Sequence, residues 1–117
     1  MCYVWVSVEI LDQAKVKSKK VRGLVDTGAT LTTLPERLAA GLNIVPTSQD
    51  RIQAVPGELT IKKGRAVVRI GNREELQAVW ISDVIDKVLI GSVTLETLGL
   101  RVNPVTGKIE ETPLLLC

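Results

Sequence analysis

Short aliphatic runs separated by turn-forming residues dominate the sequence, and they limit what the chain can fold into. Residues 3–11 alternate, with Val4, Val6 and Val8 on one face and Tyr3 and Trp5 on the other. Such alternation is typical of a half-buried strand, and β-branched residues favour strands in general. Aromatic residues make up only 3% of the chain, so we expect an aliphatic core. The pattern predicts an all-β protein with one or two short helices.

The other elements are predicted from the same patterns of apolar residues and turns. Strands are expected at residues 21–25, 64–70, 74–81, 87–90, 101–103 and 108–111, and a hairpin over residues 49–61. The hairpin is expected to turn at Pro56-Gly57, because proline and glycine are frequent turn residues. A chain of 117 residues has room for one core, and we find no linker or repeat in it. Residues 1–117 are therefore expected to form a single domain.

Two short segments have the signals of helices. Residues 35–41 are expected to form a helix with Pro35 in its first turn and Gly41 at its C-cap. A second helix is expected over residues 92–98, with Ser92 as the N-cap and Gly99 closing the helix.

The absence of histidine removes several kinds of chemistry. Without histidine there is no Ser-His-Asp or Cys-His catalysis and no His-ligated zinc. The two cysteines, Cys2 and Cys117, lie at opposite ends of the sequence, so no C-x-x-C pair is available for metal or redox work. We expect both to be free thiols, which fits a reducing compartment. No cofactor or metal is expected.

The charge and hydropathy of the chain also limit its partners. A net charge of +2, with both signs spread along the chain, gives no basic stripe for nucleic acid. The first residues lack the basic and apolar regions of a signal peptide, and no apolar run approaches the length of a membrane span. We therefore expect no nucleic-acid or membrane partner and a cytoplasmic location.

A carboxylate stands where the second expected strand ends. Asp26 follows Leu24 and Val25 and is itself followed by Thr27-Gly28. Burying an aspartate is costly unless it is hydrogen-bonded. Gly28 lets the backbone turn sharply and present its N–H to the carboxylate, and the Thr27 hydroxyl can donate and accept. We expect an acid in an apolar, backbone-lined corner, a setting suited to acid–base chemistry. The alternative is an ordinary turn or cap aspartate.

A second motif lies further along the chain, where the apolar strand Val88-Leu89-Ile90 ends in Gly91 and leads into a helix. Together the two motifs resemble the retropepsin-like aspartic proteases, the single-lobed relatives of pepsin. In that family two apolar residues and Asp-Thr-Gly-Ala/Ser carry the catalytic aspartate, and a later apolar-apolar-Gly strand supports it. The resemblance runs over nearly the whole chain, and residues 88–110 look most like small stand-alone prokaryotic members. It implies a retropepsin-like acid-protease β-barrel with one lobe per chain.

The resemblance also implies an assembly. The family's chemistry needs two aspartates at one site, whereas this chain has one Asp-Thr-Gly and is too short for a second lobe. It therefore implies a C2 homodimer in which Asp26 of each subunit faces the other across the axis. One carboxyl keeps a proton and acts as general acid, while the other acts as general base on a water that attacks the peptide carbonyl.

Further roles carry over from the family to the residues that match its pattern. Thr27 resembles the threonine that hydrogen-bonds across the dimer axis beneath the two aspartates. Ala29 and Thr30 match positions that hold the substrate main chain, although retroviral members commonly have Asp where this chain has Thr30. The remaining substrate-binding candidates are apolar or flap residues: Leu24, Ile90, Val55, Pro56 and Gly57. Leu24 shares a strand face with Asp26, Ile90 is expected to form an apolar wall of the site, and residues 55–57 are expected to form the tip of a flap.

Several other features have a plain structural interpretation beside a functional one. Asp83 and Asp86 are expected to be solvated rather than a second acidic pair. Lys62, Lys63 and Arg65 are expected to line a solvated strand edge rather than bind phosphate. Pro56-Gly57 forms either a plain turn or a mobile flap, and residues 114–116 form either a strand in a dimer sheet or part of the core.

The sequence therefore favours one function and keeps two alternatives. The first is a homodimeric aspartic endopeptidase that cleaves extended, apolar peptides best at acidic to mildly acidic pH, with modest activity near neutrality. The second is a dimerisation or peptide-binding module that keeps the same fold with little or no catalysis. The third is an unrelated small β-barrel with a chance Asp-Thr-Gly, which would be a monomer.

Overall fold

The computed structural model describes residues 3–54 and 56–112. In these residues nine strands and two helices follow one another along the chain. The strands are β1 (Trp5–Leu11), β2 (Ser18–Val25), β3 (Thr33–Pro35), β4 (Ser48–Ala54), β5 (Gly57–Ile70), β6 (Arg73–Ser82), β7 (Val88–Ile90), β8 (Leu100–Val102) and β9 (Ile109–Glu111). The helices are α1 (Glu36–Gly41) and α2 (Ser92–Thr97), neither of which is long and apolar enough to cross a membrane. The all-β prediction is confirmed.

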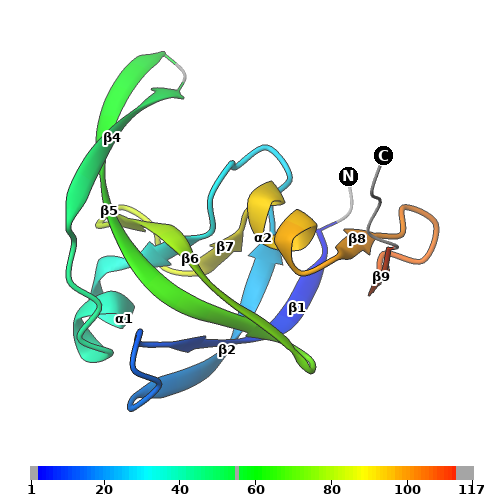
Figure 1. The fold of residues 1–117 in the computed structure, drawn as a ribbon. Coiled ribbons are helices and arrows are strands. Elements are labelled where there is room, and N and C mark those ends of the chain that lie inside the picture. The colour runs from blue at the N-terminus through cyan, green and yellow to red at the C-terminus, as the bar shows by residue number, and fades with distance from the viewer. Residues whose placement is uncertain (1–2, 55, 113–117) are drawn as a thin grey trace, which may run out of the picture.

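Six of the strands close into a barrel. The strands of the main sheet lie in the order β1-β2-β7-β3-β6-β5-β4, and an additional antiparallel pairing joins β1 to β5. That pairing closes the first six strands of the order on themselves and leaves β4 outside the barrel. β4 pairs with the first half of β5, and the two strands project from the barrel as a long arm, which is drawn in green in Figure 1. We call residues 48–63 the arm.

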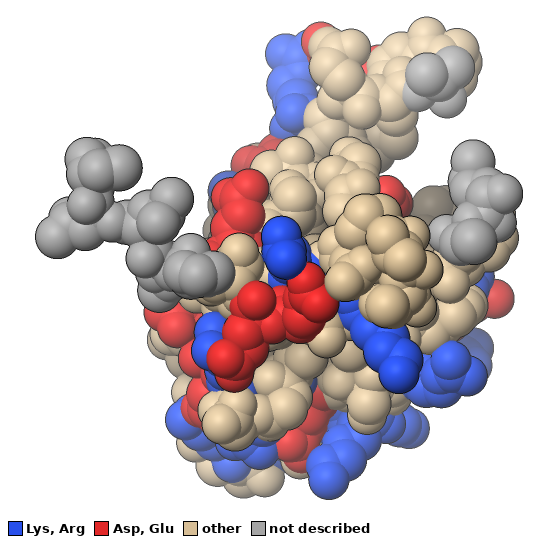
Figure 2. Space-filling view, turned by 90° about the vertical axis from the view of Figure 1, so that its right-hand side faces the viewer, with Lys and Arg blue, Asp and Glu red and all other residues tan. Residues whose placement is uncertain are grey.

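The core of the barrel is aliphatic, as expected. Val8 and Ile10 of β1 are buried while Trp5 and Ser7 are exposed, so the predicted alternation of the first strand is confirmed. The largest fully buried aliphatic side chains come from five different strands: Val8, Ile10, Leu34, Val68, Val79 and Ile90. Figure 2 shows acidic and basic side chains interspersed over one outer face of the molecule, with the arm rising above it. Several basic side chains lie side by side at the lower right of this view.

The structure corrects the prediction of separate strands on either side of Gly64. Residues 57–70 form one continuous strand, β5, which passes from the arm into the barrel. Gly64 lies inside this strand because the chain comes close there: an added Cβ would stand 3.1 Å from the carbonyl oxygen of Val45. Lys62 and Lys63 are therefore not on a sheet edge, since β5 has β4 on one side and β6 on the other.

The predicted ends of both helices also shift by one residue. Gly91, not Ser92, is the N-cap of α2, it makes no side-chain cap hydrogen bond, and Ser92 is the first helical residue. In α1 the N-cap is Pro35, while Gly41 is the last helical residue and Leu42 the C-cap. Gly99 closes α2 as predicted, with a φ of 67° that suits glycine.

Candidate active site

Asp26 stands directly after β2 and is held by backbone groups on both sides. Its N–H donates to the carbonyl oxygen of Ile90 at 2.9 Å, and its own carbonyl accepts from the N–H of Ala29 at 3.0 Å. The N–H of Gly28 donates to Oδ1 of Asp26 at 3.0 Å. The sequence-based expectation that Gly28 would present its N–H to the carboxylate is confirmed. The half-buried Asp26 side chain is therefore oriented by the loop that follows it.

The strand β7 lies beside β2 and supports this loop. The two strands pair in parallel, with Gly23, Leu24 and Val25 opposite Val88, Leu89 and Ile90. Beyond the strand, the N–H groups of Ser92 and Val93 donate to the carbonyl oxygens of Ala29 and Thr30 at 2.9 and 3.1 Å. The supporting role that the sequence analysis gave to the Ile90-Gly91 strand is thus visible in the backbone.

Gly91 permits this arrangement because no side chain fits there. A Cβ at residue 91 would lie 2.5 Å from the carbonyl carbon of Leu31 and 2.8 Å from the carbonyl oxygen of Thr30. Both are backbone atoms, which a rotamer change cannot move aside. The glycine allows the chain after β7 to lie directly against the loop that follows Asp26.

A chain of buried hydrogen bonds supports the segment that follows the Asp26 loop. The N–H of Gly91 donates to the Thr32 hydroxyl at 3.1 Å, and the Thr32 and Thr94 hydroxyl oxygens lie 2.5 Å apart. The Thr94 hydroxyl in turn donates to the side-chain carbonyl of Gln77. Each hydroxyl can donate once and accept once, so the chain has a consistent direction. Sequence analysis did not identify these polar residues, because they lie on elements far apart in the sequence.

A pocket of about 590 Å³ opens between the Asp26 loop and the arm. Its lining is largely apolar and comes from the loop after β2, the arm, β6 and the segment before β7. The lining residues are Asp26, Gly28, Ala29, Thr30, Thr33, Arg51, Ile52, Gln53, Leu59, Ile61, Trp80, Ser82, Val84, Ile85 and Leu89. Figure 1 shows the loop after β2 at the top of the barrel, toward the end from which the arm projects.

The pocket contains some of the predicted site residues and not others. Asp26, Gly28, Ala29 and Thr30 line it, and Thr27 is exposed in the same loop. Ile90 does not line it: its side chain is fully buried in the core, and Leu89 forms the apolar wall instead. Successive residues of a strand point to opposite sides, which explains the one-residue error.

Three other predicted substrate-binding residues do not line the pocket of the single subunit. Gly23 faces the core side chains of Val8 and Ile90. Leu24 lies on the other face of β2, opposite its strand partner Trp5. Pro56 and Gly57 are exposed at the far end of the arm, and none of these three predicted residues lines the pocket. Val55 lies outside the described residues, as do Cys2, Cys117 and residues 114–116.

A polar contact at the base of the arm is not evident from the sequence. The indole N–H of Trp80 on β6 donates to Oδ2 of Asp50 on β4 at 2.9 Å. The ammonium of Lys63 lies 3.1 Å from Oδ1 of the same carboxylate. The hydrogen bond from Trp80, followed by that from Lys63, holds the pKa of Asp50 below its ordinary value of 3.8. Alternation along β6 places Trp80 on the outer face, but nothing in the sequence pairs it with Asp50.

Several charged residues outside the pocket are exposed or paired. Asp83 and Asp86 are both exposed, and Asp86 pairs with Lys87 at 2.7 Å. Lys62 lies 3.4 Å from Glu36. Across residues 3–54 and 56–112, no group of three or more His, Cys, Asp or Glu side chains is placed to hold a metal ion.

Comparison with known proteins agrees with this geometry. The family model described as aspartyl protease matches residues 12–94. The EIAV protease, solved in complex with the inhibitor HBY-793, is 18% identical with a TM-score of 0.64, and the match covers 98% of this chain and 94% of that one. The solution structure of the simian foamy virus (mac) protease is 21% identical with a TM-score of 0.58, covering 80% of this chain and 93% of that one. No curated protein matches the sequence. At these identities the structural likeness concerns the fold.

Proposed function

Because the chain belongs to the aspartyl protease family, we propose that it is a homodimeric endopeptidase in which Asp26 of each subunit shares one catalytic site. Family membership makes the protein a peptide hydrolase. The observation that carries the proposal is the position of Asp26 in an open, largely apolar pocket, with its carboxylate oriented by the N–H of Gly28. We further propose that residues 1–117 act as one domain in each subunit.

The surface around Asp26 supports a dimer. The chain has one Asp-Thr-Gly, so a second aspartate must come from a second copy. Thr27 and Gly28 are exposed in the single subunit, beside the half-buried Asp26. Trp5 of the neighbouring β1 is also 41% exposed, next to its strand partner Leu24. An exposed loop with an aromatic residue nearby suits contact with another subunit.

In this dimer the two carboxyl groups divide the chemistry between them. Two carboxylates a few ångströms apart do not both ionise readily, so one holds a proton and donates it as general acid. The other accepts a proton from a bound water, which attacks the peptide carbonyl. The amide nitrogen leaves with a proton and no covalent intermediate forms. The N–H of Gly28 keeps one carboxylate oxygen of each Asp26 in place during these transfers.

The pocket lining suggests what the enzyme binds. Ala29, Thr30, Ile52, Leu59 and Leu89 line the pocket. In this proposal the first two hold the substrate main chain, and the three apolar residues contact substrate side chains. Leu24 would complete a pocket with the partner subunit, while residues 55–57 would form the tip of a flap over the substrate. We therefore propose extended peptides with apolar residues near the scissile bond. The cytoplasmic location and modest activity near neutral pH remain predictions.

Proteolysis of a mixed peptide library by the wild type and by Asp26→Asn tests the mechanism. Products are identified by mass spectrometry at pH values from about 3 to about 8, a range wide enough to show both limbs of an acid–base profile. We expect cleavage that peaks in acid and falls by at least about a thousandfold in the Asn variant. Size-exclusion chromatography of both proteins provides the control for folding and assembly. Equal cleavage by both would contradict the assignment of Asp26.

A second candidate function is a peptide-binding or dimerisation module with little catalysis. The observation that favours it is Thr30, which stands where retroviral members commonly have an acid. The same experiment separates the two functions. Peptide association without cleavage, by a wild-type preparation shown to be dimeric, would support the binding module and overturn the endopeptidase.

A further inference from the structure

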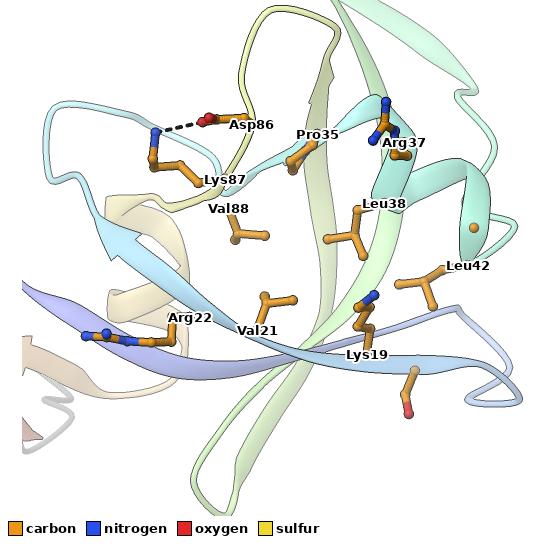
Figure 3. Close-up of a pocket in the computed structure, with 12 residues that line it drawn as sticks. Lys19, Val21, Arg22, Pro35, Arg37, Leu38, Leu42, Asp86, Lys87 and Val88 are labelled. Carbon is orange, nitrogen blue, oxygen red and sulfur yellow. Dashed lines mark hydrogen bonds and ion pairs between the residues drawn. The ribbon is translucent and has the colours of Figure 1, made fainter.

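A second groove lies on another side of the barrel from the Asp26 pocket. It has a volume of about 530 Å³ and lies between the first half of β2, the helix α1 and the segment that leads into β7. No residue that lines it also lines the Asp26 pocket. Figure 3 shows Val21, Val88 and Leu38 reaching into the groove from these three elements.

The groove exists because the barrel is incompletely paired at this point. β7 pairs only with residues 23–25 of β2, whereas β1 pairs with β2 along residues 18–24. Residues 18–22 therefore have a strand partner on one side only within the described chain. Their second edge faces α1 across the groove, and Val21, Leu38, Leu42 and Val88 form an apolar floor. An unpaired strand edge beside apolar side chains can accept an extended peptide.

Basic side chains surround this floor. Lys19, Arg22, Arg37 and Lys87 line the groove together with one acid, Asp86. Four cations and one anion give it a net charge of +3, whereas the whole chain carries +2. The charge of the molecule is therefore concentrated here.

Within the part of the chain that the structure describes, Lys87 alone among the four cations has an acidic partner. Lys87 pairs with Asp86 at 2.7 Å, and Arg22 lies over the Trp5 ring at 5.4 Å. Among residues 3–54 and 56–112, no carboxylate pairs with Lys19, Arg22 or Arg37. Lys19 and Arg37 can therefore meet charge on a ligand, whereas Arg22 is held over the Trp5 ring.

We propose that this groove binds an extended peptide segment in which acidic residues alternate with apolar ones. Apolar side chains would contact Val21, Leu38 and Val88, and carboxylates would meet the surrounding cations. The backbone would pair with the open edge of β2. The groove does not involve Asp26, so this binding is independent of peptide hydrolysis.

The test uses a fluorescein-labelled peptide of alternating Glu and Val residues, followed by fluorescence anisotropy. Asp26→Asn protein keeps the peptide intact, and a peptide with Lys in place of Glu serves as the probe control. We expect saturable binding of the Glu peptide and little binding of the Lys peptide. In the Lys19→Glu variant the Kd should rise about tenfold, as a favourable charge contact becomes a repulsive one.

Lys20→Glu is the matched control for net charge. Lys20 is exposed and adjacent on the same strand but does not line the groove, so its Kd should change less than about twofold. Equal weakening by Lys19→Glu and Lys20→Glu would show nonspecific attraction to a basic protein and would overturn the proposal.

A second variant blocks the groove without changing charge. Gly41 lines it, and a Cβ at this position meets no atom within 4 Å, so the backbone there has room for a side chain and Gly41→Phe adds bulk at the groove. In the Asp26→Asn protein, we expect Gly41→Phe to weaken binding of the Glu peptide. In the protein that keeps Asp26, we expect Gly41→Phe to leave hydrolysis of short apolar peptides unchanged. If neither Gly41→Phe nor Lys19→Glu changes the Kd, the peptide binds elsewhere and the proposal is wrong. The proposal is also wrong if the wild-type groove binds no Glu peptide. Recruitment to anionic phospholipid vesicles in place of the peptide would also overturn it.

Discussion

At Gly91 two backbone segments lie closer together than any side chain allows. The loop after Asp26 and the turn into α2 meet there, with an imaginary Cβ only 2.5 Å from a backbone carbon of Leu31. The same glycine donates its N–H to the buried Thr32 hydroxyl. Asp26 is thus positioned by a contact in which its own side chain takes no part.

Replacing Gly91 by alanine should therefore reduce both stability and activity. The added methyl must push the Thr30–Leu31 backbone aside, and overpacking of this kind costs about 1–3 kcal/mol. Urea unfolding measures the loss, and peptide hydrolysis should fall because the Asp26 loop moves. Gly41→Ala is the matched control, since its Cβ enters open space and alanine favours the helix. A Gly91→Ala variant as stable and active as Gly41→Ala would contradict the packing argument.

Residues at the site differ in how far the sequence reveals them. Asp26 and Gly28 could be predicted because their contact is local, two residues apart. The contact of Thr32 with Thr94 spans 62 residues and that of Thr94 with Gln77 spans 17, and no local pattern pairs them. Ile90 was misplaced by one residue because alternation identifies two faces of a strand without saying which one the pocket lies on.

One carboxylate adds a side-chain link between the arm and the barrel at the base of the arm. Asp50 on β4 accepts from Trp80 on β6 and from Lys63 on β5, so one side chain joins three strands. The far end of the arm is exposed at Pro56 and Gly57. This contact therefore supports the arm beside the Asp26 pocket, together with the pairing of β5 with β6.

Asp50→Asn should lower stability at neutral pH and lose this effect in acid. The pKa of Asp50 is lowered in the folded protein from its ordinary value of 3.8. Near that pH the unfolded chain therefore binds more protons at residue 50 than the folded protein does, so acid favours unfolding. The contribution is present above that pH and disappears as the pH falls through the lower, folded value. Urea midpoints of wild type and variant between about pH 2 and pH 7 should converge at the acid end. The exposed Asp83→Asn provides the control, and a constant difference across the range would contradict the prediction.

Most elements were predicted from periodicity and turns, and the errors have physical causes. The hairpin around Pro56-Gly57, the strand 88–90 and both helices are present. Gly64 was taken as a strand boundary because glycine is frequent in turns, whereas here it gives the backbone room inside a long strand. Ser92 was predicted as the N-cap from its residue type alone. The N-cap is Gly91, where close packing against the Leu31 backbone requires glycine.

At the scale of the whole molecule, the proposed dimer should respond to pH. Two Asp26 carboxyls that share a proton attract, whereas two ionised carboxylates repel, so association should weaken as the pH rises. We expect the dimer Kd to increase by about tenfold or more between about pH 4 and pH 8, measured by sedimentation equilibrium. The Asp26→Asn dimer should lack this dependence. If the wild-type dimer has the same Kd at both pH values, the proposal that the two Asp26 carboxyls share a proton is wrong.

The barrel as a whole could be predicted only through the resemblance to a family. Periodicity predicts strands but not their order, and the closing contact between β1 and β5 joins residues as distant as Glu9 and Arg69. The groove beside α1 was not predicted either. It arises because β7 is shorter than β2 and pairs with only part of it, and the sequence does not show which strands will pair.

The parallel pairing of β2 with β7 also has a consequence for the order in which the protein is made. During synthesis Asp26 leaves the ribosome long before its support, since Gly91 follows Thr32 by 59 residues. Contacts so distant in sequence form late, because a long loop must close first. Until β7 emerges, the loop that carries Asp26 lacks the backbone contacts from Ile90, Ser92 and Val93 that support it. The fold thereby delays the appearance of a competent hydrolase until most of the chain has been translated.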